Sequence, residues 1–162
     1  MSAATLHFFC GKAGAGKSTK AKQLAHARSA ILLSEDIWLS RLYGDQIKVF
    51  DDYIRCSQKL SAVITPLVVD LLTAGVSVVM DFQANTKRRR SWFRSMFEEA
   101  KAEHVMHFLE TPDGLCLERI AKRNGEMPEG ASKLTEADYW YVTSYFEPPD
   151  ESEGFHVQAY AP

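Results

Sequence analysis

Short apolar runs alternate along the chain with longer segments in which apolar residues recur every three or four positions. The short runs have the length of strands, and the longer segments have the periodicity of helices that bury one face. Elements that alternate in this way predict an α/β fold, with a parallel sheet covered by helices on both faces, because crossover connections are right-handed. The predicted strands cover residues 6–10, 30–34, 76–81, 105–110 and 155–160, and the predicted helices cover 20–27, 49–74, 86–102, 112–124 and 135–145.

Three local signals refine this pattern. Pro66 lies inside the predicted helix 49–74, where we expect it to kink the helix without ending it. Residues 125–130 (Gly-Glu-Met-Pro-Glu-Gly) predict an irregular, mobile loop. Thr135 and Asp138 resemble a capping box with aspartate in place of the usual Glu or Gln, so a helix should begin there.

Length and charge narrow the class of protein. The 162 residues predict a single domain over 1–162, and the formal net charge of −2 provides no broad cationic field for nucleic acid or an anionic membrane. A small or local substrate is therefore favoured. No apolar run approaches the roughly 20 residues of a membrane span, and the first residues lack a signal-peptide pattern, so we expect a cytoplasmic protein.

The three cysteines show no spacing typical of a zinc site or a redox pair. Cys10 ends a predicted strand, whereas Cys56 and Cys116 fall within helical patterns. We expect all three to be reduced, buried and apolar in role.

Residues 11–19 (Gly-Lys-Ala-Gly-Ala-Gly-Lys-Ser-Thr) follow the first apolar run and fit the phosphate-loop pattern Gly-x-x-x-x-Gly-Lys-Ser/Thr. Glycines let backbone N–H groups converge on phosphates, and the next helix adds its positive dipole end. We expect Lys17 to reach the β- and γ-phosphates and Ser18 to bind Mg²⁺. The alternative is a glycine-rich turn with Lys17 solvated. The predicted nucleotide-binding residues are Gly11, Ala13, Gly14, Ala15, Gly16, Lys17, Ser18 and Thr19.

Carboxylates follow or end two of the predicted strands. Parallel strands bring their carboxyl ends to one rim, so Asp36 and Asp81 should lie near the phosphate loop. Asp81 suits a position that supports Mg²⁺, and its alternative role is to cap the next turn. Asp36 suits a base that deprotonates an acceptor hydroxyl, with helix capping as its alternative and Glu35 as the competing carboxylate.

Arg119 and Arg123 are one helical turn apart, just before the predicted loop. Their guanidinium groups could stabilise the transferred phosphoryl group from a closing lid, and Arg123 lies nearer the loop. Alternatively, both arginines pair with Glu118 or Glu126 on a solvated helix face.

A basic run and several aromatic residues complete the candidates. The run 87–90 (Lys-Arg-Arg-Arg) is interpreted chiefly as solvated surface, from which one or two residues could contact an anionic acceptor. Some of the aromatic residues could wall an acceptor pocket, although most are expected in the core. They are Trp38, Tyr43, Phe82, Trp92, Trp140 and Tyr145.

These motifs together resemble the small bacterial predicted kinases of the P-loop superfamily, an AAA-type ATP-binding group. That group is similar to polynucleotide kinase, chloramphenicol phosphotransferase, zeta toxins and gluconate kinases. The resemblance spans nearly the whole chain and implies a three-layer P-loop NTPase fold, a five-stranded parallel sheet and a helical lid near residues 119–134. It also implies ATP and Mg²⁺ as cofactors, with Lys17 and Ser18 binding phosphates and metal, Asp36 as base, and Arg119 or Arg123 in the lid. The segments that carry it are 11–19, 34–36, 79–82, 119–124 and 145–151.

The sequence departs from polynucleotide kinases after the predicted base. Those enzymes place an arginine shortly after the aspartate, whereas residues 37–40 precede Arg41 here. An Asn-Lys-x-Asp motif for guanine is absent from the sequence, which argues against a GTPase. We therefore expect transfer of the γ-phosphoryl group of Mg-ATP to a hydroxyl of a small-molecule acceptor. The alternatives are a regulatory nucleotide-binding ATPase without an acceptor and a nucleic-acid 5′-hydroxyl kinase.

Overall fold

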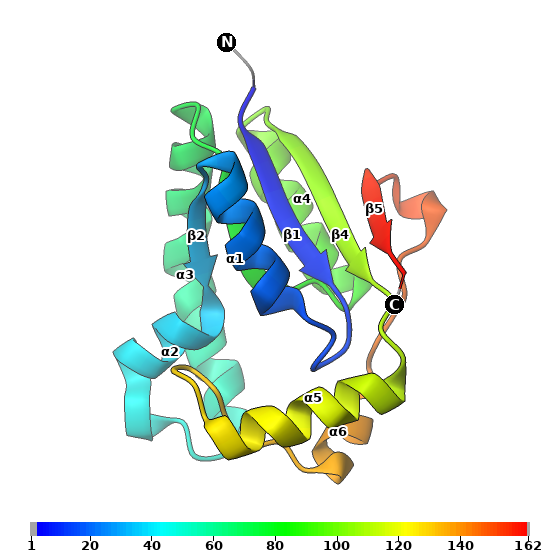
Figure 1. The fold of residues 1–162 in the computed structure, drawn as a ribbon. Helices are drawn as coiled ribbons and strands as arrows, with labels where there is room; N and C mark the ends of the chain where they lie inside the picture. Colours follow the sequence, from blue (N-terminus) through cyan, green and yellow to red (C-terminus); the bar gives the residue numbers. More distant parts are fainter. Residues whose placement is uncertain (1–2, 162) are drawn as a thin grey trace.

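The computed structural model describes residues 3–161, in which five parallel strands form one sheet in the order β2-β3-β1-β4-β5 (Figure 1). This confirms the predicted five-stranded parallel sheet. Every neighbouring pair of strands is parallel, as crossover connections through helices require. The strands are β1 (Thr5–Cys10), β2 (Ile31–Ser34), β3 (Val78–Gln83), β4 (Glu103–Leu109) and β5 (Val157–Tyr160).

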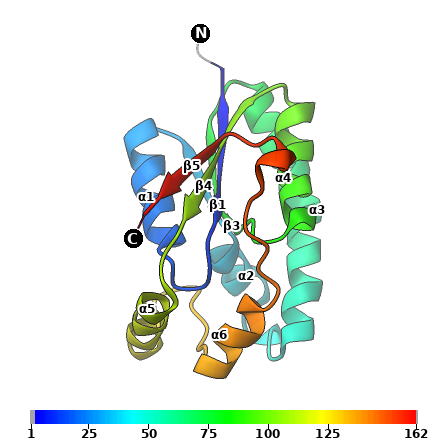
Figure 2. The same ribbon diagram turned by 90° about the vertical axis from the view of Figure 1, so that its right-hand side faces the viewer.

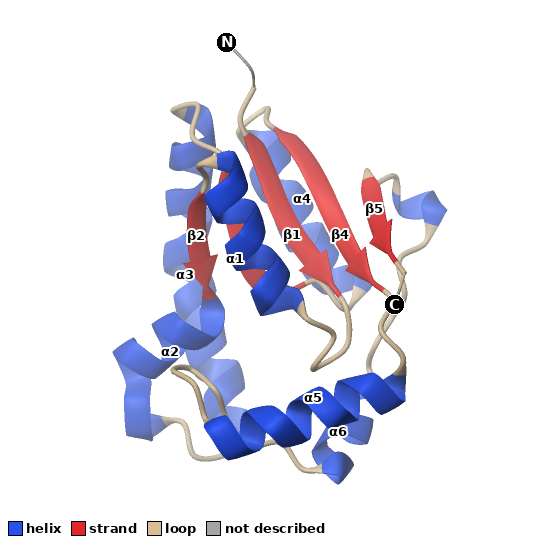
Figure 3. Cartoon of the chain, viewed as in Figure 1, coloured by secondary structure: helices blue, strands red, loops and turns tan. Residues whose placement is uncertain are grey.

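Helices cover both faces of the sheet and the rim beyond its carboxyl edge. In Figures 1 and 2, α1 lies on one face and α3 and α4 lie on the other, while α5 and α6 lie beyond the strand ends. Figure 3 shows the resulting helix–sheet–helix layers. The helices are α1 (Lys17–Arg28), α2 (Glu35–Tyr43), α3 (Phe50–Thr73), α4 (Lys87–Glu99), α5 (Asp113–Glu126) and α6 (Glu136–Thr143).

Alternation along β1 sends neighbouring side chains into different cores. Phe8 faces α4, where its ring stacks on Phe93 at a centroid distance of 4.6 Å. Phe9 packs in a separate cluster with Ala21 of α1. A third cluster joins the phosphate loop to α5 and α6 through Ala15, Cys116, Ile120 and Tyr139, so the helices at the rim have a core of their own.

Several element boundaries differ from the sequence prediction. The strand β3 continues to Gln83, so Asp81 lies inside the strand rather than at its end. The helix α5 runs through Gly125 to Glu126, where the composition had predicted loop.

Two other local predictions agree with the structure. The helix α3 continues through Pro66, which was not expected to end it. The capping box at Thr135 forms with Asp138 as its acidic member, because the shorter side chain still reaches the Thr135 N–H at 2.9 Å.

The interpretation of residues 87–90 as solvated surface is wrong for half of the run. Lys87 and Arg88 are exposed, whereas Arg90 is fully buried and donates to Glu153 at 2.8 Å and to the Ala84 carbonyl at 2.9 Å. Arg89 donates to Glu35 at 3.0 Å. The reason is that α4 turns one face of this run toward the sheet, where carboxylates from other elements meet the guanidinium groups.

The cysteines have the predicted character. Cys10, Cys56 and Cys116 are buried free thiols, and burial raises the pKa of Cys10 to about 11. Within residues 3–161, none of the helices combines the length and the apolar character needed to cross a bilayer.

Candidate nucleotide and phosphoryl-transfer site

The phosphate loop connects β1 to α1 and has the backbone that its glycines allow. Gly14 and Gly16 have φ angles of 76° and 104°, which side chains disfavour. A Cβ atom on Gly14 would lie 2.5 Å from the Cys116 carbonyl oxygen, so α5 packs against the bare backbone. Gly16 provides no side-chain cap for α1, and the N–H groups of its first turn remain available to an anion.

Side chains outside the motif hold the loop in place. Asn85 accepts from the Gly11 N–H at 2.9 Å and donates to the Gly11 carbonyl at 2.8 Å. Thr111 and Arg119 both donate to the Ala15 carbonyl, at 2.9 Å and 3.0 Å. Sequence reasoning missed Asn85 and Thr111, because an amide or hydroxyl after a strand carries no pattern that distinguishes a loop anchor from a turn residue.

Lys17 is held inside the loop. Its ammonium group donates to the carbonyls of Gly11 and Lys12, the latter at 2.9 Å. Burial lowers the pKa of Lys17, while the Asp81 carboxylate acts in the opposite direction. The geometry disfavours the alternative of a freely solvated lysine.

The two predicted acidic residues lie at the same rim. The parallel register pairs Ser34 of β2 with Asp81 of β3, and Asp36 follows Ser34 in the first turn of α2. Burial raises the pKa of Asp81, whereas a hydrogen bond with the Ser18 hydroxyl lowers it. Ser18 and Asp81 thus present adjacent hard oxygen atoms, which fits Mg²⁺ bound jointly with phosphates. Within residues 3–161, no group of three or more His, Cys, Asp or Glu side chains could hold a metal ion.

Asp36 differs in environment from its neighbour Glu35. Asp36 is open to solvent on one side, and burial together with the Glu35 and Asp81 carboxylates raises the pKa of Asp36 to about 6. Glu35 is buried and accepts hydrogen bonds from Tyr53 at 2.7 Å, Ser57 at 3.0 Å and Arg89 at 3.0 Å. Glu35 is therefore committed to the fold, which leaves Asp36 as the available carboxylate. Ser34 rather than Asp36 occupies the N-cap of α2.

The two arginines of α5 serve different parts of the site. Arg119 binds the Ala15 carbonyl and lines a pocket beside Gly16 and Thr19. Burial raises the pKa values of Asp36 and Asp81, and the Arg123 guanidinium is close enough to offset part of that rise. The buried Nε of Arg123 has no hydrogen-bond partner within residues 3–161. In the same part of the chain, neither arginine pairs with Glu118 or Glu126, and Glu126 instead faces Lys122 at 4.0 Å.

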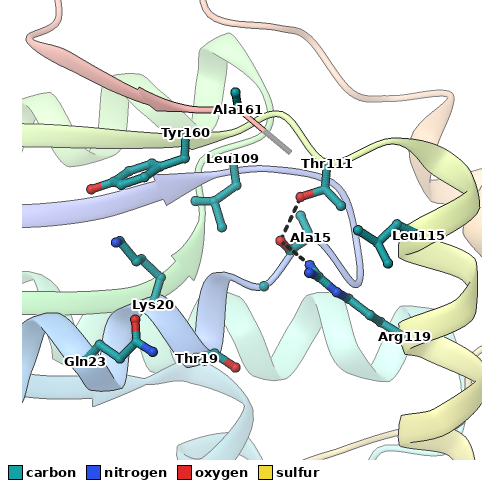
Figure 4. Close-up of a pocket in the computed structure, with 11 residues that line it drawn as sticks. Ala15, Thr19, Lys20, Gln23, Leu109, Thr111, Leu115, Arg119, Tyr160 and Ala161 are labelled. Carbon is teal, nitrogen blue, oxygen red and sulfur yellow. Dashed lines mark hydrogen bonds between the residues drawn. The ribbon is translucent and has the colours of Figure 1, made fainter.

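The pocket at Arg119 has a volume of about 410 Å³ and opens beside the phosphate loop (Figure 4). Its opposite wall is Tyr160, whose ring lies 4.2 Å from the Lys20 ammonium. The Tyr160 hydroxyl is 2.8 Å from His107 Nδ1, and His107 Nε2 is 3.0 Å from His7 Nδ1. The guanidinium group of Arg119 and the ring of Tyr160 lie at opposite ends of the pocket, and either could stack on a planar base (Figure 4). The pocket is also lined by Thr19, Gln23, Leu109, Thr111 and Leu115.

The loop between α5 and α6 reaches the start of α2. Gly130 has a φ angle of 83°, and a Cβ atom there would lie 3.0 Å from the Asp36 carbonyl carbon. The adjacent Glu129 pairs with Arg41 at 2.6 Å. Arg41, whose spacing departs from that of polynucleotide kinases, is thus engaged by this loop.

The aromatic candidates divide into two groups. Phe82 is buried, and Trp38, Tyr43 and Trp92 pack against the main core, as expected for most of the set. Trp140 and Tyr145 are exposed on and after α6.

Comparisons with solved structures agree with this architecture. A Chloroflexus aurantiacus J-10-fl protein to which kinase activity has been ascribed is similar with a TM-score of 0.77 and 18% identity, covering 99% of this chain and 89% of the other. Chaetomium thermophilum Kti12, in complex with ADP-AlF3, is similar with a TM-score of 0.67 and 14% identity, and the match covers 96% of this chain and 89% of Kti12. Mycobacterium tuberculosis APS kinase CysC, in complex with AMPPNP and APS, is similar with a TM-score of 0.66 and 20% identity, and the match covers 100% of this chain and 90% of CysC. At these identities the similarity shows the fold.

Sequence comparison identifies the family. No curated protein sequence matches the chain. The family model AAA_33, described as an AAA domain, matches residues 6–149, which include the phosphate loop, both acids and α5. The chain therefore belongs to this AAA domain family, and its fold is that of P-loop kinases.

Proposed function

We propose that the protein transfers the γ-phosphoryl group of Mg-ATP to a hydroxyl of a small-molecule acceptor. The observation that carries this proposal is the position of Asp36. It is the carboxylate left free by the fold, and it lies at the rim that also carries Asp81, Lys17 and Arg123. A phosphate-binding loop alone would also suit an ATPase, whereas an available carboxylate beside it suits the activation of a hydroxyl.

The proposed reaction is a single displacement at phosphorus. The acceptor oxygen forms a bond to the γ-phosphorus, the bond from that phosphorus to the β–γ bridging oxygen breaks, and ADP leaves with the electron pair. The acceptor proton moves to Asp36. Lys17 and Arg123 offset negative charge on the phosphoryl oxygens. Ser18 and Asp81 would hold Mg²⁺, which neutralises phosphate charge when bound.

The base of the nucleotide would occupy the pocket between Arg119 and Tyr160. This pocket adjoins Gly16 and Thr19, so a triphosphate on the loop leads directly into it. The phosphates then separate the base pocket from the acidic residues, which places the acceptor on the α2 side.

The substitution Asp36→Asn tests the assignment of the base. Because the amide cannot take the proton, acceptor-dependent ADP release should fall by about 10²-fold or more, while ATP affinity measured by calorimetry stays nearly unchanged. The exposed Asp70 supplies a matched control, since Asp70→Asn makes the same chemical change near the carboxyl end of α3, away from the rim. Equal turnover in wild type and Asp36→Asn would remove Asp36 from this role.

A second candidate is a nucleotide-dependent regulator without an acceptor. It is favoured by the contact of Gly130 with the Asp36 backbone, which links the lid loop to the acidic rim. Such a protein would hydrolyse ATP slowly, and its hydrolysis would not depend on any added alcohol.

A further inference from the structure

Three aromatic side chains form an exposed row between α3 and α6. Phe50, Tyr141 and Tyr145 are 54%, 55% and 61% exposed. Phe50 meets Tyr141 edge to face at a centroid distance of 6.3 Å, and Tyr141 meets Tyr145 at 5.5 Å. Rings from two separate elements that pack on one another while facing solvent are typical of a surface that binds something.

This aromatic row connects to the acidic rim through Tyr53. The Phe50 ring lies 6.1 Å from the Tyr53 ring, and the Tyr53 hydroxyl donates to Glu35, the residue before Asp36. Burial and the Glu35 carboxylate are the main causes of the raised pKa of Tyr53, and the Asp36 carboxylate is near enough to add to them. The row therefore lies on the acceptor side, whereas the base pocket is built from Thr19, Lys20 and Tyr160.

The charges around the row argue against an anionic acceptor. Arg41 is paired with Glu129, Arg55 with Asp52, and Arg89 with Glu35. The hydrogen bond with Tyr145 is the main cause of the raised pKa of Tyr141, and the Asp51 carboxylate adds to it. A phosphate or carboxylate on the apolar body of the acceptor would thus meet guanidinium groups that already have partners and a carboxylate that repels it. Arg123, whose Nε lacks a partner within residues 3–161, is the exception, and the proposed transfer uses it on the γ-phosphoryl group. The exposed ammonium closest along the chain is that of Lys48, two residues before Phe50.

We propose that the acceptor is an uncharged alcohol that carries a planar or ring-shaped apolar body, which stacks on one of the rings of Phe50 and Tyr141 and meets the other edge to face, while its hydroxyl faces Asp36. This inference rests on the proposed function and names its substrate class. In the transfer, the acceptor oxygen bonds to the γ-phosphorus, the bond to the bridging oxygen breaks, ADP leaves, and the hydroxyl proton passes to Asp36.

Paired acceptors that differ in charge provide the test. We would compare 4-nitrophenyl glucoside with 4-carboxyphenyl glucoside, 4-methylbenzyl alcohol with 4-(hydroxymethyl)benzoic acid, and 1-phenyl-1,2-ethanediol with 4-(1,2-dihydroxyethyl)benzoic acid. Each pair keeps every hydroxyl group and differs by one carboxylate on the ring. Phosphorylated product would be followed by ³¹P NMR, together with ADP release. We expect transfer to neutral members and at least a tenfold lower kcat/KM, about 1.4 kcal/mol, for their anionic partners. If transfer favours the anionic acceptors, the inference of a neutral acceptor is wrong and the proposed kinase function stands. If neither the neutral nor the anionic acceptors are phosphorylated, the inference and the proposed function are both contradicted.

Substitutions in the aromatic row provide a second test of the inference. Phe50→Ser and Tyr141→Ser remove exposed rings, so the fold should persist, and each should raise the KM for the neutral acceptor about tenfold with ATP affinity unchanged. Val63→Ser, a similar loss of exposed apolar surface elsewhere on α3, is the matched control. An effect of Lys48→Ala that exceeds those of the ring substitutions would contradict a neutral acceptor. A change of sedimentation coefficient without a change in KM would identify the row as a contact between copies and overturn the inference.

Discussion

Arg119 and Arg123 are separated by one helical turn, yet their surroundings differ. Arg119 is fixed by the Ala15 carbonyl at the mouth of the pocket that ends at Tyr160. Arg123 faces the two acids across the rim, with a buried nitrogen that lacks a partner within residues 3–161. A buried donor without a partner is costly, so a ligand that supplies an acceptor there would be bound more strongly.

Substitution of each arginine by glutamine should therefore separate binding from transfer. Arg119→Gln should raise the Kd for ATP about tenfold and leave kcat nearly unchanged, because it removes a contact made equally before and during the reaction. Arg123→Gln should lower kcat by about 10²-fold or more with a small effect on Kd. Calorimetry and steady-state kinetics measure the two quantities. If the two variants share one kinetic signature, the division of roles is wrong.

At the scale of elements, the helices at the rim form a unit with the phosphate loop. Ala15 packs with Cys116 and Ile120 of α5 and with Tyr139 of α6. The Tyr139 hydroxyl donates to Asp113 at 2.5 Å, and Asp113 also binds Lys12 at 3.0 Å. The loop between these helices is anchored at its end by Asn124, which exchanges two hydrogen bonds with Leu134. The middle of the loop approaches the Asp36 backbone at Gly130.

The substitution Gly130→Ala tests whether this loop positions the base. A Cβ atom there would strain a backbone with φ of 83° and press on the Asp36 peptide, so we expect kcat to fall about tenfold or more with ATP affinity preserved. Gly125→Ala is the control, because Gly125 lies in α5 with open space around its Cα. Equal behaviour of the two variants would separate the loop from catalysis.

At the scale of the whole molecule, a buried histidine pair couples the sheet to pH. Burial, His7, Lys20 and Arg28 lower the pKa of His107 to about 4, and burial also lowers that of His7. The native state thus keeps neutral histidines that the unfolded chain protonates near pH 6.5. Their contribution to stability is fully present above about pH 6.5 and is lost as the pH falls toward 4.

Urea unfolding of wild type and His107→Gln at pH 7.5 and pH 5 measures this contribution. We expect the unfolding midpoint of wild type to fall more between the two pH values than that of the variant. The raised pKa values of Asp36 and Asp81 act in the opposite direction, because they stabilise the folded state as the pH falls. Both proteins share this effect, so the difference between their shifts in unfolding midpoint reports the contribution of the histidines. Parallel pH dependence in the two proteins would contradict the assignment.

The sequence predicted those features that depend on local pattern. Periodicity located all five strands, and the phosphate-loop motif located the turn between β1 and α1. Features that depend on how helices turn against the sheet could not be predicted. A run of four basic residues does not reveal that Arg90 faces inward, and helical spacing does not reveal that Phe50 and Tyr141 meet. The extent of the domain over 1–162 and the lid near 119–134 stay predictions.

The fate of the γ-phosphoryl group tests the central claim most directly. ATP labelled with ³²P at the γ position would be incubated with the protein and a neutral alcohol, and the label would be located in a single turnover. We predict label on the acceptor with wild type and none with Asp36→Asn, although both bind ATP. Label found only in inorganic phosphate with wild type, or equal labelling of the acceptor by Asp36→Asn, would contradict a kinase in which Asp36 activates the acceptor.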